Sequence, residues 1–202
     1  MLKKYKYLLL SILSGILLAL SFEKFNLFFL VWVAFVPLIF VVYENKFLKS
    51  ILYGFITGIT FSLVSFDWMF LFLLKNTKSL LDSFVVSIIV WLGLSIYFMF
   101  FVCLLNGIKK YNKFIVAFFA ASAWVVLEYI RNYFFGSFPI NLLGYSQHSF
   151  ASLIQCADVF GVYGISFVIM FINVLLFYFL QDKKIKYLIV SIFVISSIVV
   201  YG

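Results

Sequence analysis

Three charged residues lie inside long apolar stretches and are the first candidates for chemistry. Asp67, Glu128 and Arg131 fall at similar depths along helices that run in the same direction. Arg131 follows Glu128 by three residues on one helix face, and Trp124 precedes Glu128 by one turn. We expect one polar cluster in which Arg131 touches at least one acid. Its interpretation stays open between a structural ion pair and a polar patch that holds a lipid headgroup or a partner's polar end.

The other reactive side chains form no recognisable catalytic pattern in the sequence. His148 is the single histidine, and a solvated loop position is expected for it. Cys103 and Cys156 are expected on opposite sides of a membrane, and no Cys/His spacing suits zinc. There is no Ser/His/Asp grouping, no phosphate-binding glycine loop and no acidic pair suited to metal-assisted chemistry. We therefore expect no catalytic residue, metal or cofactor within these 202 residues.

The elements that must position these residues are apolar segments long enough to cross a membrane. Hydrophobic residues make up 66% of the chain and charged residues only 11%. A bilayer core of about 30 Å needs roughly 20 apolar residues per helix, and lipid-exposed backbone must satisfy its own hydrogen bonds. The predicted fold class is all-α, a polytopic membrane bundle of about seven transmembrane helices. The expected spans are residues 7–22, 25–43, 50–74, 83–108, 114–133, 159–181 and 186–202.

The basic residues indicate the orientation of this single transmembrane domain, residues 1–202. Eleven of the fifteen Lys and Arg residues fall at the N-terminus and in alternate loops, at 44–49, 109–113 and 182–186. By the positive-inside rule the N-terminus is cytoplasmic and the C-terminus lies outside. The net charge of +8 is thereby explained by topology, and no nucleic-acid partner is expected.

The segment 134–158 is predicted to be an interfacial outer loop. Gly136, Pro139 and Asn141 interrupt any spanning helix, and the surrounding aromatic residues suit a membrane interface. Two interpretations stay open: a simple connection, or a wall for an amphipathic molecule that enters sideways from the outer leaflet.

Some residues have a structural explanation that needs no ligand. Gly54 and Gly58 are expected to let two helices approach closely. Pro37 is expected to kink the second span, and Asp158 to cap the N-terminus of the sixth.

Several stretches resemble the membrane domain of apolipoprotein N-acyltransferases. They are residues 20–27 and 32–38, residues 54–58 leading to Trp68, residues 123–131 with 136–147, and residues 157–167. They follow the family's order, and residues 123–147 carry the most specific resemblance. Two departures are Glu23-Lys24, where the family often has prolines, and Ile140, where an aromatic residue is common.

The resemblance implies a function in lipoprotein maturation at the bacterial cytoplasmic (inner) membrane. In that family a nitrilase-like domain with a Glu-Lys-Cys triad takes an acyl chain from a phospholipid donor. It passes the chain to the diacylglyceryl-cysteine of an apolipoprotein through a thioester. That domain would begin outside the membrane, near residue 202. Neither Cys103 nor Cys156 matches its nucleophile, so this chain alone is expected to be catalytically inactive.

The resemblance assigns to this chain the roles of anchoring the catalytic domain and shaping lateral lipid entry. The tentative residues of the lipid and lipoprotein site are Asp67, Trp68, Glu128, Arg131, Phe138, Asn141, Tyr145 and Gln147. The alternatives are a non-catalytic membrane scaffold derived from the family, or a small transporter or channel. A transporter would need a polar midplane pathway or an internal repeat, and neither is visible in the sequence.

Overall fold

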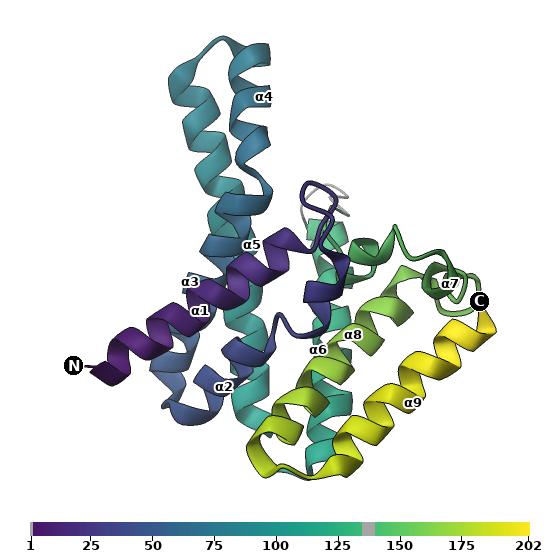
Figure 1. Cartoon of the computed structure of the whole chain (residues 1–202). Coiled ribbons are helices and arrows are strands. Elements are labelled where there is room, and N and C mark those ends of the chain that lie inside the picture. Colours follow the sequence, from purple (N-terminus) through teal and green to yellow (C-terminus); the bar gives the residue numbers. More distant parts are fainter. Residues whose placement is uncertain (1, 135–139) are drawn as a thin grey trace.

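The chain folds into a bundle of helices in the computed structural model, which describes residues 2–134 and 140–202 (Figure 1). Within these residues there is no strand, so the predicted all-α class is confirmed. The helical elements are α1 (Leu2–Leu20), η1 (Phe28–Trp32), α2 (Val36–Glu44), α3 (Phe47–Ser65), α4 (Asp67–Thr77), α5 (Leu80–Ile108), α6 (Lys113–Phe134), η2 (Leu143–Gln147), α7 (Ala151–Ile154), α8 (Ala157–Asp182) and α9 (Ile185–Tyr201).

Four helices in the described residues are long and apolar enough to cross a membrane. They are α3, α5, α8 and the Lys113–Asn132 part of α6. Shorter apolar helical segments at 5–20, 28–44 and 185–201 correspond to the remaining three expected spans. The arrangement is that of a helical membrane bundle, and the number of crossings stays a prediction.

The second expected span is broken before Pro37 rather than kinked at it. η1 ends at Trp32, and Pro37 lies in the first turn of α2, where its missing N–H costs nothing. Asn173 of α8 satisfies the backbone groups that the break exposes. Its Oδ1 accepts from Phe35 N at 2.9 Å, and its Nδ2 donates to Val31 O at 2.8 Å. Such a break is tolerated inside a membrane because protein groups replace the lost helical hydrogen bonds.

The third expected span, 50–74, consists of two helices instead of one. α3 ends at Ser65, and the buried residue Phe66 leaves the helical conformation before α4 begins at Asp67. α4 and the first part of α5 then project together beyond the rest of the bundle (Figure 1). α5 has 29 residues, about 43 Å of helix, which exceeds the roughly 30 Å core of a bilayer.

Glycines allow α3 to pack tightly between α1 and α5. A Cβ on Gly58 would lie 2.6 Å from Ser95 Cα, and one on Gly54 would lie 2.8 Å from a Val102 methyl group. On the other side, a Cβ on Gly15 of α1 would lie 2.6 Å from Thr57 O. The expected close approach at Gly54 and Gly58 is therefore confirmed.

Aromatic side chains fill the middle of the bundle around Trp124 of α6. Its ring lies against three phenylalanines from α5 and the broken second segment: Phe35 at 4.7 Å, Phe101 at 5.1 Å and Phe98 at 5.3 Å between ring centroids. Edge-to-face contacts of this kind add to the gain from burial. The core thus fixes the helix that carries Glu128 and Arg131.

The expected outer loop, 134–158, contains two short helices in its described part, η2 and α7. α8 follows, with a non-helical residue, Gly161, at φ 64° near its start. Asp158 lies in the first turn of α8 rather than at its N-cap, which is Cys156. The carboxylate still lies near the positive end of the helix.

Candidate functional site

Glu128 connects α6 to the segment that follows it. Its side chain is 3% exposed. Its Oε1 accepts a hydrogen bond from Trp124 Nε1 at 2.9 Å, as the shared helix face predicts. The same oxygen accepts from Leu143 N at 2.7 Å, at the start of η2. A buried carboxylate that accepts two N–H bonds fixes the position of η2 against α6.

Arg131 is held one turn further along α6. It is 6% exposed, and its Nη2 donates to Ile140 O at 3.1 Å. Among the described residues, Arg131 Nε and Glu128 Oε2 have no hydrogen-bond partner. Glu128 and Arg131 do not form an ion pair with each other, because none of the ion pairs within 4.0 Å in the described part of the chain joins them. The two charges attract each other across a gap, and the predicted direct contact is not formed.

A small cavity of about 20 Å³ lies in front of these two charges. Phe22 follows α1, Phe61 belongs to α3 and Tyr97 to α5, and the loop after α6 contributes Asn141. The volume is just above what one ordered water requires. The site as folded therefore has room for a water that bridges Arg131 and Glu128, and a lipid phosphate can reach it only if the lining side chains move.

Asp67 and Trp68 lie outside this cavity. Asp67 begins α4 and forms an exposed ion pair with Lys24, Nζ to Oδ2, at 2.6 Å. Trp68 is 44% exposed and lies beside Phe72 on α4. The expected cluster of Asp67 with Glu128 and Arg131 is thus replaced by a separate pair with Lys24.

Gln147 and Tyr145 play different parts within η2. Gln147 is fully buried, donates to Phe28 O at 3.1 Å and accepts from Trp32 Nε1 at 3.3 Å. These bonds tie η2 to η1 and leave the amide no free face for a ligand. Tyr145 is exposed. Phe138 lies outside the described residues.

Three of the residues predicted from the sequence lie together in the structure, but several of their neighbours were not predicted. Glu128, Arg131 and Asn141 line one cavity, and Tyr97 and Phe61 complete it from other helices. Tyr97 and Phe61 could be predicted only from knowledge of which helices are neighbours, which the sequence does not give. Lys24 had a signal in the sequence, because it is a cation expected on the same side of the membrane as Asp67.

The two thiols lie in different surroundings. Cys103 is partly buried within α5, and Cys156 Sγ donates to Leu153 O at 2.9 Å. Burial raises the pKa of the Cys156 thiol, which opposes formation of the nucleophilic thiolate. Among the residues described there is also no group of three metal-binding side chains.

An all-helical bundle with long apolar helices and a buried charged pair near one end belongs to the class of helical membrane proteins. Residues 14–175 match the model of the family described as "Apolipoprotein N-acyltransferase N-terminal domain". The chain belongs to this family.

Curated relatives agree with this assignment. The chain is 33% identical over 174 residues to the apolipoprotein N-acyltransferase of Geobacter metallireducens, a match that covers 84% of this chain and 32% of the relative. It is 30% identical over 188 residues to apolipoprotein N-acyltransferase 1 of Treponema denticola, covering 89% and 32%. For the Thermotoga maritima enzyme the identity is 28% over 192 residues, covering 88% and 36%. The chain spans about a third of the length of these relatives.

Proposed function

We propose that this chain is the membrane domain of an apolipoprotein N-acyltransferase of a bacterial inner membrane. The observation that carries the proposal is the family match over residues 14–175. The complete enzyme takes an acyl chain from a membrane phospholipid and transfers it to the diacylglyceryl-cysteine of an apolipoprotein. The domain crosses the membrane seven times, with the N-terminus in the cytoplasm and the C-terminus outside.

Within that enzyme the domain positions lipid for a catalytic domain on the outer side. The site at Glu128 and Arg131 supports this role, because a buried guanidinium with an unpaired Nε is a suitable partner for a phosphate or ester oxygen. Asn141 lines the same cavity from the outer loop. Trp68 and Tyr145 are exposed aromatic residues of the expected outer side, where such rings favour the membrane interface.

The projecting α4–α5 hairpin supports a second part of the role. Its outer surface carries exposed apolar side chains, among them Leu71, Phe72, Leu81 and Phe84. Such a surface is stable only against lipid or another apolar surface. We propose that it borders the path by which lipid substrates reach the catalytic domain.

A chimera tests the proposal. The matched segment of the Geobacter metallireducens enzyme is replaced by residues 14–175 of this chain. The purified chimera is given phospholipid vesicles and a diacylglyceryl-cysteine peptide. Acylation of the peptide is expected from the chimera, and none from the enzyme without a membrane segment or from residues 1–202 alone.

Two outcomes would contradict the proposal. A folded, membrane-inserted chimera without acylation would favour a scaffold that has lost the acyltransfer role. Acylation by residues 1–202 alone that is lost in Cys103→Ala or Cys156→Ala would place the nucleophile in this chain and refute the assignment of domains.

A further inference from the structure

A second pocket, of about 340 Å³, lies at the opposite end of the bundle from Arg131, between the α5–α6 and α8–α9 connections. Its lining includes three lysines, one carboxylate and two tyrosines: Lys113, Lys184, Lys186, Asp182, Tyr111 and Tyr187. Both connections belong to the lysine-rich loops expected in the cytoplasm. This pocket shares no lining residue with the cavity at Arg131.

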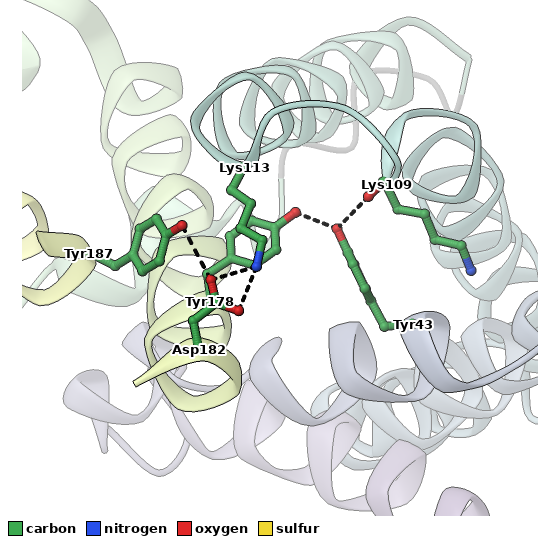
Figure 2. A network of polar contacts seen from close by, with 6 residues as sticks. All are labelled: Tyr43, Lys109, Lys113, Tyr178, Asp182 and Tyr187. Atoms are coloured by element: carbon green, nitrogen blue, oxygen red, sulfur yellow. Dashed lines mark hydrogen bonds and ion pairs between the residues drawn. The ribbon is translucent and has the colours of Figure 1, made fainter. Parts of the chain in front are cut away.

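The carboxylate of the pocket is already neutralised. Lys113 Nζ lies 2.5 Å from both Asp182 oxygens, and the Tyr187 hydroxyl donates to Asp182 Oδ2 at 3.4 Å (Figure 2). The Lys113 ammonium also lies 5.0 Å from the centre of the Tyr178 ring. Further inside, the hydroxyls of Tyr178 and Tyr43 hydrogen-bond each other. This network gives the pocket a rigid floor, with Lys113 and Asp182 committed to each other.

Two further lysines lie at the mouth of the pocket and form no close ion pair with a described residue. Lys184 and Lys186 are exposed, and the ion pairs found within the described residues do not include them. Lys186 lies 5.5 Å from the centre of the Phe114 ring and 5.1 Å from that of Tyr187. These rings hold the ammonium at the pocket. The lining therefore carries a net positive charge that attracts an anion.

The start of α9 adds to this attraction. Its N-cap, Lys184, makes no side-chain capping bond, and its first turn contains no acidic residue. The positive end of the helix dipole is thus left without a negative group of its own. An anion in the pocket would supply the missing charge.

The surface next to the pocket favours a lipid over a free anion. Ile185, Ile189 and Phe193 are all exposed on α9, one turn apart along the helix. They form an apolar stripe that leads away from Lys184 and Lys186 along the bundle. A phosphate with an attached acyl chain would meet both the lysines and the stripe.

We propose that this pocket binds the phosphate of an anionic phospholipid in the leaflet on the lysine-rich side, with an acyl chain along α9. Lys184 and Lys186 bind the phosphate, and the Lys113–Asp182 pair sets the depth of the pocket. The lipid acts as a fixed structural partner at the end of the domain opposite to Arg131. The proposal is independent of the acyltransfer function.

Native mass spectrometry of the whole chain tests it. The purified protein, in detergent, is given equal amounts of phosphatidylglycerol and phosphatidylcholine, and the first bound lipid is identified. The wild type is expected to retain phosphatidylglycerol preferentially. The double variant Lys184→Gln/Lys186→Gln should bind it about tenfold more weakly, and Lys184→Arg/Lys186→Arg should keep most of the affinity.

Matched controls separate this site from general charge effects. Lys46→Gln/Lys49→Gln removes the same charge from another exposed lysine-rich loop and should leave lipid binding unchanged. An unchanged preference in the Lys184/Lys186 double Gln variant, or an equal loss in the Lys46/Lys49 variant, would overturn the proposal. Displacement of phosphatidylglycerol by an equal concentration of inorganic phosphate would also overturn it, because the pocket would then recognise the phosphate alone.

Discussion

Glu128 receives hydrogen bonds from two N–H groups, Trp124 Nε1 on its own helix and Leu143 N at the start of η2, 15 residues further along the chain. The side chain therefore decides how the outer segment is attached to α6. Because the side chain is buried, an N–H group that loses this acceptor costs free energy.

Replacing Glu128 should destabilise the bundle in a graded way. Glu128→Ala leaves both N–H donors without an acceptor, and we expect a loss of about 2 to 4 kcal/mol. Glu128→Gln keeps an oxygen in place and should cost less than half as much. Thermal unfolding in detergent, followed by circular dichroism, measures both. Equal stability of wild type and Glu128→Ala would show that the two hydrogen bonds do not support the fold.

Arg131 and Lys24 are both cations expected on the outer side, and they should respond differently to removal. Arg131→Ala takes away a buried guanidinium bound to Ile140 O and should lower stability by about 2 kcal/mol or more. Arg131→Lys should recover only part, because a point charge cannot reproduce the planar fork. Lys24→Ala removes one side of an exposed pair and should change stability by less than about 0.5 kcal/mol.

The same detergent unfolding assay, together with acyltransfer by the chimera, compares these variants. If Arg131→Ala is as stable and as active as Lys24→Ala, Arg131 has neither a structural nor a lipid-binding role.

At the scale of helices, α3 is packed closely on two sides. α1 covers one of its faces and α5 the other, and glycines stand at the points of closest approach. Thr57 of α3 also donates to Ser11 O of α1 at 3.0 Å. Any side chain added at these positions must separate two helices.

Gly58→Ala should therefore be destabilising, whereas Gly107→Ala should not. A Cβ at position 58 meets Ser95 Cα at 2.6 Å, and overpacking of this kind costs about 1 to 3 kcal/mol. At Gly107, also helical, an added Cβ meets nothing within 4 Å, so the substitution should be neutral or stabilise by up to about 1 kcal/mol. Unfolding midpoints in the same detergent compare the two, and an equal effect of both would refute the packing argument.

The sequence predicted helices well and predicted their interruptions poorly. Apolar length and the distribution of Lys and Arg are local properties, so the apolar segments could be found one at a time. The break before Phe35 depends on Asn173, which lies 138 residues away. The hydropathy of a segment does not indicate such a distant partner. The end of α3 at Ser65 is likewise not marked by Pro or Gly, which are the usual signals.

The candidate site was partly predictable for the same reason. Trp124 and Glu128 are helical neighbours, so their contact follows from the sequence alone. Glu128 and Arg131, three residues apart, are also helical neighbours, yet each bonds to a backbone group of the outer segment instead of to the other. That preference depends on how η2 folds back over α6, which spacing does not describe.

At the scale of the whole molecule, the charges distinguish the two ends of the bundle. The lysine-rich connections at 109–113 and 182–186 meet at one end, and the charged pair of α6 lies near the other. The α4–α5 hairpin projects at the end opposite to the lysines (Figure 1). A bilayer would then enclose the middle of the bundle and leave the hairpin tip beyond it.

Reporter fusions test this orientation. A fusion at residue 1 should report a cytoplasmic location and one at residue 202 an exterior location, because the basic loops are retained inside. A third fusion in the connection at residue 78, between α4 and α5, should report the exterior. Termini on the same side would mean that the number of crossings is even.

The dependence of the broken second segment on Asn173 also sets an order of events during synthesis. Phe35 leaves the ribosome 138 residues before its partner, which at about 5 to 20 residues per second is roughly 7 to 28 s. Throughout that interval the N–H group of Phe35 needs water or an insertion factor as a temporary partner. A nascent chain stalled before residue 173 should therefore be modified by a water-soluble thiol reagent at a cysteine introduced in place of Ala34. A chain stalled well beyond residue 182 should be protected.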